Sequence, residues 1–326
     1  MLFVYTLSDR CLRQAVHAPH EPLPDDAVWI DMFQPTQEEE RAVEQALRLD
    51  VPTREELEEI EISSRLYREK DAMFMTATLI AQADTPRPET TAVTFVLAGQ
   101  RLVTVRYAAL RSFSMFVSQQ QRRPRATASG ELVMLGLLDA IVDRIADLLE
   151  RAGGDLDAVS LEIFSHNGSG GPRRRAGGLQ EALRRIGRNG DITSKISESL
   201  VTLARLLSFL GQAKDKQNFR KLHGLLEVLD YDVRSLTSHA AFLSGKANFL
   251  LSATLGMVNI EQTDIIKIFS VAAVMFLPPT LVASIYGMNF AFMPELHWTF
   301  GYPLAVLLMI ISAVIPFTLF KKRGWL

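Results

Sequence analysis

The polar side chains that could do chemistry in this sequence lie at the end of a charge-free apolar run, Ile268 to Tyr286. Thr280 and Ser284 are four residues apart, so a helix would place both hydroxyl groups on one side, with Asn289 at its outer end. Hydroxyl and amide oxygens can accept hydrogen bonds from the water shell of a hard cation such as Mg²⁺, which gives up that water reluctantly. Small polar residues also pack membrane helices together, so the residues alone leave pore lining and helix packing equally open.

Four apolar residues continue that side of the predicted helix towards the N-terminus, at helical spacing: Leu277, Ala273, Phe269 and Ile266. The stretch between Ile265 and Phe290 contains no Asp or Glu. A carboxylate ring inside a conduit could bind a cation too tightly to release it, so hydroxyl and amide groups suit passage better. Glu295 lies in the following loop, where its carboxylate either attracts cations to the mouth or is an ordinary solvated side chain.

These side chains must be positioned by a pair of apolar runs, Ile268 to Tyr286 and Gly301 to Phe320. Each run has about 20 residues, which at 1.5 Å per residue matches the ~30 Å hydrocarbon core of a bilayer. The connecting loop from Gly287 to Phe300 has no Lys or Arg. Four basic residues flank the pair: Lys267, Lys321, Lys322 and Arg323. The positive-inside rule therefore predicts a transmembrane hairpin with both chain termini in the cytoplasm.

A heptad pattern precedes the first run and continues towards it. Its positions alternate steps of four and three residues: Leu222, Leu226, Leu229, Val233, Leu236, Ala240, Leu243, Ala247, Leu250, Thr254 and Met257. No helix breaker occurs between Asn218 and Pro278, so we expect one helix of roughly 100 Å that ends at Tyr286. A seam of that length needs partners from the preceding helices and from other copies of the chain, which favours an oligomeric stalk over one packed helix.

The N-terminal part alternates strand and helix patterns. Strands are predicted over six ranges: 2–7, 11–16, 28–33, 71–81, 91–97 and 101–106. Pro35-Thr36 and Pro52-Thr53 predict two helix starts, with Thr at the N-cap and Glu in the first turn. A further helix is expected over residues 109–121. These patterns indicate an α/β domain.

Helical patterns fill the middle of the chain. A helix over 131–150 is weakened at Gly153-Gly154 and is expected to continue to Phe164. A glycine-rich turn is predicted from His166 to Gly178, and the return helix has two segments, 179–186 and 192–210. Three parts are therefore predicted: an α/β domain (1–125), a helical hairpin with a long stalk helix (126–263), and two transmembrane helices with their loop (264–326).

Bulk features exclude several classes of protein. The 326 residues carry a net charge of −2, which argues against a nucleic-acid binder, and Cys11 is the only cysteine, which argues against a disulfide or thiolate site. The start MLFVYTLSDR predicts no signal peptide.

No GxxxxGK[ST] phosphate loop occurs. A potential of −100 mV supplies ~4.6 kcal/mol to a divalent cation, so passive influx needs no ATP, and we expect neither an enzyme nor a cofactor.

A family resemblance rests on the residues that close the first run, Tyr286-Gly287-Met288-Asn289-Phe290. With Met293 to Leu296 after them and a Lys-Lys-Arg-Gly-Trp-Leu end, they resemble the bacterial branch of the CorA family of divalent-cation channels. The likeness is tightest from Lys246 to Leu326. It is looser at Val28 to Asp31 and at Pro52 to Leu57.

The resemblance implies a homopentameric inner-membrane channel in which each subunit supplies one pore-lining helix. It assigns the outer selectivity filter to Gly287, Met288 and Asn289. Thr280 and Ser284 would form polar rings, and Leu277 an apolar constriction. The family often has Gly at the Ser284 position and Met at the Leu277 position, so this chain departs from it there. The implied cargo is Mg²⁺, with Co²⁺ and Ni²⁺ also passing, in contact with membrane lipid.

The resemblance also implies closure by cytoplasmic Mg²⁺ bound to acidic residues between subunits. The candidates on the stalk are Glu227, Asp230 and Asp232, and an ordinary solvated helix face explains them equally well. Two other functions stay open. One is a Zn²⁺ transporter like the related ZntB proteins, which usually depart from Gly-Met-Asn. The other is a membrane-tethered sensor or scaffold that transports nothing.

Overall fold

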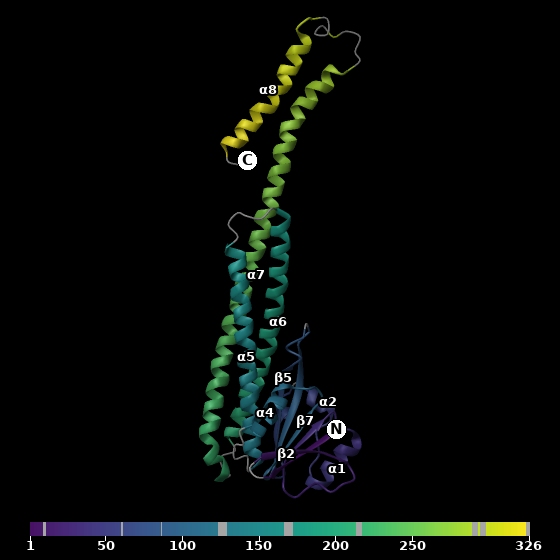
Figure 1. Ribbon diagram of the computed structural model, residues 1–326, viewed down its shortest axis with the longest axis vertical. Coiled ribbons are helices and arrows are strands. Elements are labelled where there is room, and N and C mark those ends of the chain that lie inside the picture. The colour runs from purple at the N-terminus through teal and green to yellow at the C-terminus, as the bar shows by residue number, and fades with distance from the viewer. Residues whose placement is uncertain are drawn as a thin grey trace. The chain divides into compact units, whose positions relative to one another are not determined.

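The computed structural model describes residues 1–8, 11–59, 61–85, 87–122, 129–165, 172–212, 217–288, 293 and 298–323 (Figure 1). The chain forms two compact units. One is Met1–His166 with Ala182–Leu250, and the other is Asn167–Glu181 with Leu251–Leu326. The three-part division expected from the sequence stays a prediction, since these units follow other boundaries.

Seven strands of the first unit form one sheet in the order β2-β1-β3-β7-β6-β5-β4. Their bounds are Leu2–Ser8 (β1), Cys11–His17 (β2), Ala27–Phe33 (β3), Leu66–Glu69 (β4), Ala72–Ala81 (β5), Glu89–Ala98 (β6) and Arg101–Arg106 (β7). All neighbours pair antiparallel except β3 and β7, which run in parallel. The six predicted strands are present. The sequence missed β4 because this edge strand has only four residues and no buried side to give an alternating pattern.

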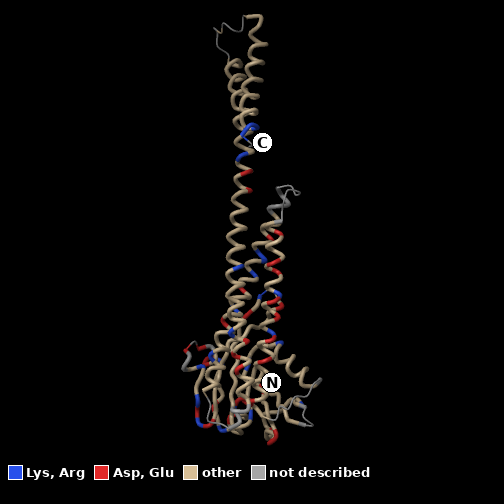
Figure 2. Tube along the Cα trace, turned by 90° about the vertical axis from the view of Figure 1, so that its left-hand side faces the viewer, with Lys and Arg blue, Asp and Glu red and all other residues tan. Residues whose placement is uncertain are grey.

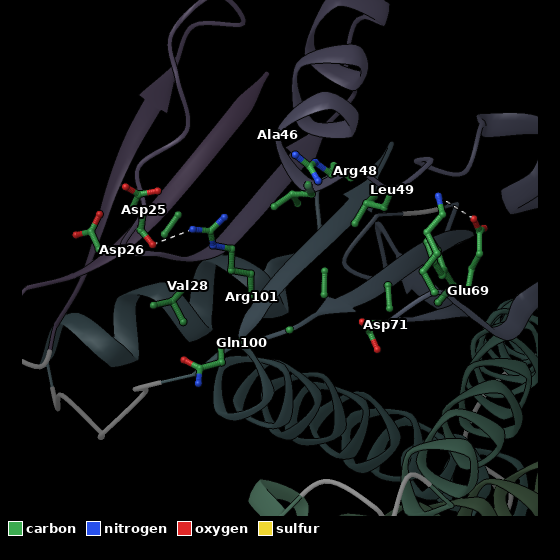
Figure 3. Close-up of a pocket in the computed structure, with 17 residues that line it drawn as sticks. Asp25, Asp26, Val28, Ala46, Arg48, Leu49, Glu69, Asp71, Gln100 and Arg101 are labelled. Carbon is green, nitrogen blue, oxygen red and sulfur yellow. Dashed lines mark hydrogen bonds and ion pairs between the residues drawn. The ribbon is translucent and has the colours of Figure 1, made fainter.

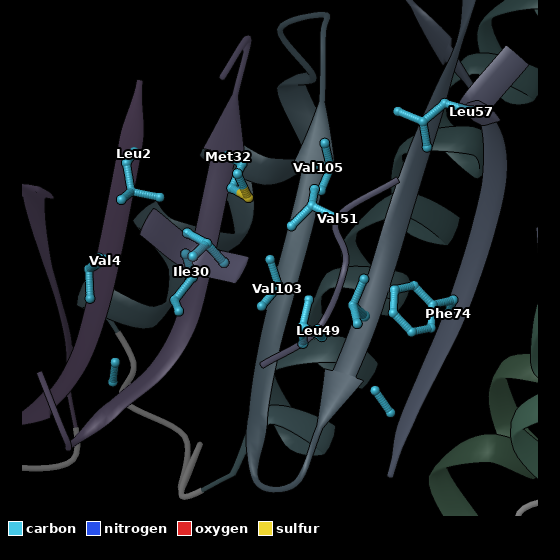
Figure 4. Packing of buried hydrophobic residues seen from close by; sticks show 14 residues of the cluster. Leu2, Val4, Ile30, Met32, Leu49, Val51, Leu57, Phe74, Val103 and Val105 are labelled. Carbon is cyan, nitrogen blue, oxygen red and sulfur yellow. The ribbon is translucent and has the colours of Figure 1, made fainter. Parts of the chain in front are cut away.

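Helices pack against both faces of the sheet. Four short ones belong to this region: Gln37–Leu47 (α1), Arg54–Glu58 (α2), Ile62–Arg65 (α3) and Arg111–Arg122 (α4). One face buries a cluster of apolar side chains, most of them from the strands, together with Val43 of α1 and Leu57 of α2 (Figure 4). On the other face, Trp29 of β3 contacts the rings of Phe113 and Phe116 of α4. This confirms the predicted α/β class.

Two capping boxes start α1 and α2 where the sequence predicts helix starts. The Thr36 hydroxyl accepts from the Glu39 backbone at 3.3 Å, and the Glu39 carboxylate accepts from the Thr36 backbone at 2.8 Å. Thr53 and Glu56 repeat the arrangement. Each box satisfies donors that a helix N-terminus otherwise leaves unpaired, and both helices begin where Pro-Thr followed by Glu predicts a start.

Three long helices follow: Gly130–Ser165 (α5), Pro172–Gly211 (α6) and Gln217–Tyr286 (α7). The predicted turn from His166 to Gly178 is wrong for residues 172–178, which are helical, while 166–171 lie outside the described residues. The expected break between residues 186 and 192 is also wrong. Gly187 and Gly190 lie inside α6, because packing of buried Ile186 and Ile192 outweighs the modest helix penalty of glycine.

The heptad seam of α7 is buried within one chain over its N-terminal half. Nine of its residues are less than 9% exposed: Leu222, Leu226, Leu229, Val233, Ala240, Leu243, Ala247, Leu250 and Thr254. Polar contacts fix the neighbouring helices in register. Asp155 of α5 accepts from Arg185 and Asn189 of α6. Although burial acts to raise the pKa of Asp155, these hydrogen bonds lower it.

A buried ion pair joins the two parallel strands. The guanidinium of Arg106 on β7 donates to both carboxylate oxygens of Asp31 on β3, at 2.8 Å from Nη2 to Oδ2. Thr104 donates to the same carboxylate at 2.8 Å and accepts from Nε1 of Trp29 at 3.0 Å. The Asp31 side chain is 2% exposed and that of Arg106 is 11% exposed. The hydrogen bonds from Arg106 and Thr104 therefore compensate the Asp31 carboxylate for the water that it loses on burial in the sheet.

A second ionic cluster, here called the arginine clasp, fixes the β5–β6 loop. Asp84 of that loop accepts from Arg111 of α4 at 3.1 Å and from two residues of α5, Arg144 at 2.6 Å and Arg151 at 2.9 Å. Hydrogen bonds from Arg151 above all, with those from Arg144 and Arg111, lower the pKa of Asp84 to about 2. One carboxylate thus ties the sheet to two helices.

The second unit contains the end of α7 and the helix Gly301–Lys322 (α8). Among the described residues, two helices are long and apolar enough to cross a membrane: α7 and α8. Figure 2 shows charged residues crowded over the N-terminal part of the chain and almost none along these last helical segments. This confirms the predicted pair of apolar C-terminal helices.

Replacing Arg106 with Met tests the buried ion pair. Asp31 would keep a buried charge without its partner, so we expect the free energy of unfolding to fall by about 3–5 kcal/mol. Denaturant unfolding of the detergent-solubilised chain, followed by circular dichroism, measures the change. The matched control is Arg41→Met at an exposed position of α1. A loss no larger than that of the control would contradict the assignment.

Asp84 should contribute an acid-sensitive part of the stability. Its folded pKa of about 2 lies below the ordinary 3.8, so the ionised carboxylate stabilises the fold above about pH 4 and loses that effect towards about pH 2. Asp84→Asn should therefore be less stable than the parent chain at about pH 5 and equal to it near about pH 2. Thermal unfolding across this range is the measurement. A stability difference that is the same at both ends would show that Asp84 acts through something other than its charge.

Candidate functional site

The six side chains predicted to line a pore lie on the C-terminal part of α7, and all are exposed in one chain. The large apolar ones are Ile266, Phe269 and Leu277, which are 64%, 73% and 69% exposed. The other three are Ala273, Thr280 and Ser284. Their spacing places them along one side of the helix. A single chain leaves this side uncovered, so an enclosed path can form only when further copies meet it.

The Thr280 hydroxyl is fixed by its own helix. It donates to the Phe276 carbonyl at 2.6 Å, which leaves its oxygen lone pairs free to accept. Pro278 and Pro279 lie inside α7 just before it and have no backbone N–H to donate. The helix nevertheless continues to Tyr286. Thr280 can therefore present an acceptor, the function that a hydrated cation requires of a pore wall.

Two of the three predicted filter residues close α7. Gly287 donates its backbone N–H to the Ala283 carbonyl at 2.9 Å, and Met288 donates to Ile285 at 3.3 Å. A Cβ on residue 287 would lie 3.1 Å from the Ala283 oxygen, so glycine relieves a close approach here. The carbonyl end of a helix carries partial negative charge, which favours a cation nearby. Asn289 and Glu295 lie outside the described residues.

The acidic residues predicted for regulation lie on the N-terminal part of α7, in the first unit. Glu227 is 3.3 Å from Nε2 of His223, and Asp230 is 2.8 Å from Nε of Arg234. Asp232, two residues after Asp230, is half-buried. Across the part of the chain that the structure describes, no three His, Cys, Asp or Glu side chains gather where they could hold a metal ion. One chain therefore does not by itself complete a metal site with these carboxylates.

A pocket of about 630 Å³ at one end of the sheet was not predicted from the sequence (Figure 3). Its rim has three cationic residues, Arg48, Lys70 and Arg101, and four acidic ones: Asp25, Asp26, Glu69 and Asp71. Arg101 donates to the Asp25 carbonyl at 2.8 Å and Lys70 pairs with Glu69 at 3.4 Å, as the dashed lines mark. The mixed charge favours no single class of ligand. No pore-lining or regulatory candidate lies in it.

Comparisons with known proteins agree on one family. Residues 24–322 match the family described as CorA-like Mg²⁺ transporter protein. The chain is 37% identical over 304 residues to the magnesium transport protein CorA of Sodalis glossinidius, with 92% of each chain covered.

Two solved structures share the fold. The complete structure of the CorA magnesium transporter from Methanocaldococcus jannaschii superposes with a TM-score of 0.76 at 18% identity, covering 100% of this chain and 99% of the other. The cytoplasmic domain of ZntB from Vibrio parahaemolyticus gives 0.58 at 11% identity, over 79% of this chain and 97% of the other.

Proposed function

The chain belongs to the CorA-like Mg²⁺ transporter family, and from that premise we propose that it forms a homopentameric channel for passive Mg²⁺ influx. One observation carries the proposal. The side of α7 that holds Thr280 and Ser284 is exposed in a single chain, and it ends at Gly287-Met288. Five such sides around an axis would enclose a path lined with hydroxyl, amide and apolar groups.

The cation is recognised with its water shell. Mg²⁺ binds water strongly, and neutral oxygens can accept hydrogen bonds from that shell without removing it. The Gly287-Met288-Asn289 turns of the five subunits form the outer filter, aided by the carbonyl ends of the α7 helices. Thr280 and Ser284 form polar rings beyond it, and Leu277 an apolar constriction. Co²⁺ and Ni²⁺ have similar hydrated charge and pass by the same route.

The membrane potential drives the ion inward. Each positive charge gains ~2.3 kcal/mol per 100 mV, so a divalent ion gains ~4.6 kcal/mol. In the proposed orientation both termini are cytoplasmic and the protein lies in a bacterial inner membrane, because Lys267 and the Lys321-Lys322-Arg323 cluster flank the spans. Glu295 of each subunit, on the outer side, raises the local cation concentration.

Exposed apolar side chains on α7 support an assembly of several copies. They lie outside the intrachain seam: Leu225 (52% exposed), Val228 (58%) and Phe242 (62%). A row of large apolar groups left in water is unfavourable unless another surface covers it. The heptad pattern and the 70-residue length of α7 suit a helix shared between intrachain and intersubunit packing.

One alternative is another cation transporter, a Zn²⁺ transporter of the ZntB type. The likeness to ZntB concerns the fold, whereas the Gly-Met-Asn sequence favours the Mg²⁺ assignment. A membrane-tethered sensor without transport is the alternative of another class. In that case Thr280 and Ser284 would only pack membrane helices together, and no Mg²⁺ influx would be measured.

Replacing Asn289 with Ala tests the filter. Without the amide the hydrated ion loses an acceptor at the entrance, so we expect Mg²⁺ influx into proteoliposomes to fall at least about tenfold. An entrapped Mg²⁺-sensitive dye reports the rate, and competition with Zn²⁺ tests the ZntB alternative in the same assay. Ser312→Ala is the matched control, since that hydroxyl donates to its own helix in α8 at Met309. Influx undiminished by Asn289→Ala, or absent from the parent protein, would contradict the proposal.

Regulation by internal Mg²⁺ is tested on the stalk. If Mg²⁺ closes the channel by binding Asp230 and Asp232, the double change Asp230→Ala with Asp232→Ala should leave influx open at high internal Mg²⁺. The measurement is influx into liposomes loaded with increasing Mg²⁺. Glu55→Ala, an exposed acidic position on α2, is the control. Closure at an unchanged Mg²⁺ concentration would remove these carboxylates from the regulatory site.

A further inference from the structure

The arginine clasp of Arg111, Arg144 and Arg151 around Asp84 is not electrically balanced. Three guanidinium groups surround one carboxylate, which leaves an excess of two positive charges. Arg111 and Arg151 are 63% and 54% exposed at their side chains, so both also face solvent. A guanidinium has five N–H donors, and the clasp uses few of them. The cluster can therefore accept a further anionic group.

The opposite charge is exposed on the N-terminal part of α7. Glu227 is 69% exposed and Asp230 is 35% exposed, and their partners within the chain are the local residues His223 and Arg234. Pairs of that kind at a helix surface stabilise little, so these carboxylates can exchange them for other donors. Val228 and Tyr231 lie on the same stretch of α7 and are 58% and 73% exposed. Exposed apolar side chains flanked by charged ones are typical of a protein interface.

Within one chain these two surfaces are separated. Both belong to the first compact unit. In Figure 1 the N-terminal half of α7 runs along the left of this unit, the β5–β6 hairpin rises on the right, and α5 and α6 lie between them. Two complementary surfaces on different sides of one subunit join head to tail in successive copies, and a suitable rotation closes them into a ring.

We propose that the arginine clasp of one copy pairs with Glu227 of the next copy around the ring. This rests on the proposed homo-oligomer and names the contact that holds its neighbouring N-terminal units in register. The occupant is a second copy rather than a small anion such as phosphate. The acidic surface also exposes apolar side chains that need cover, and a small anion would leave them in water. The contact is ionic and weakens as salt rises.

A double-mutant cycle on the full-length protein in detergent tests the pairing. The variants are Arg151→Gln, Glu227→Gln and both together, and analytical ultracentrifugation measures subunit association as NaCl is increased. Each single change should weaken association about two- to fivefold per interface, as expected for partly exposed ion pairs. The double variant should associate as well as the more severely affected single variant, because both single changes remove the same contact.

The controls separate this contact from general effects of charge and folding. Arg41→Gln and Glu55→Gln alter exposed charges on α1 and α2 and should leave association unchanged. Circular dichroism checks that each variant folds. If Arg151→Gln unfolds the clasp, the cycle is repeated with Arg111→Gln and Glu227→Gln.

Additive effects in the cycle would overturn the pairing. The pairing would also be overturned if added phosphate changed subunit association through the arginine clasp while Glu227→Gln left association unchanged. None of these results contradicts the proposed function if the parent protein is oligomeric and transports Mg²⁺. A parent protein that is monomeric or carries no Mg²⁺ would instead contradict the proposed function.

Discussion

The backbone hydrogen bonding of α7 is the constraint on which the rest of the structure depends. A segment inside a bilayer must satisfy its polar backbone groups internally, and a helix does so while it remains unbroken. The same 70-residue helix begins in a charged three-helix bundle and ends at the polar turn that closes the first apolar run. At 1.5 Å per residue, a helix of 70 residues is about 105 Å long.

Side chains, rather than the backbone, distinguish the two environments of that helix. Its N-terminal half buries Leu226, Val233 and Leu243 against α5 and α6. Its C-terminal part exposes Ile266, Phe269 and Leu277 instead. In water this exposure would be unfavourable, whereas among lipids and further copies it is the ordinary state of such residues. The exposed part of α7 thus belongs to an assembly in a membrane, and one copy shows only a fraction of it.

Sequence patterns predicted the elements whose signals are local. Thr36 with Glu39, the alternation in β6 and β7, and the charge-free runs each encode an element within a few residues. The continuity of α6 across Gly187 and Gly190 could not be predicted, because it depends on packing of residues such as Ile196 against distant helices. The candidate pore side followed from helical spacing alone. The arginine clasp did not, since residues 84, 111 and 151 meet only after the sheet and two helices have assembled.

The parallel pairing of β3 with β7 also bears on how the protein is made. Asp31 and Arg106 are 75 positions apart, and the antiparallel strands β5 and β6 are synthesised between them. The ribosome must therefore deliver β7 before the centre of the sheet can close, and such distant contacts form slowly. Translation reaches the apolar hairpin only after another 160 or so residues, at a pace of ~5–20 residues per second. The sheet thus has several seconds to mature before the lipid-seeking segments leave the exit tunnel, which keeps nascent strands from sharing the aqueous phase with exposed membrane helices.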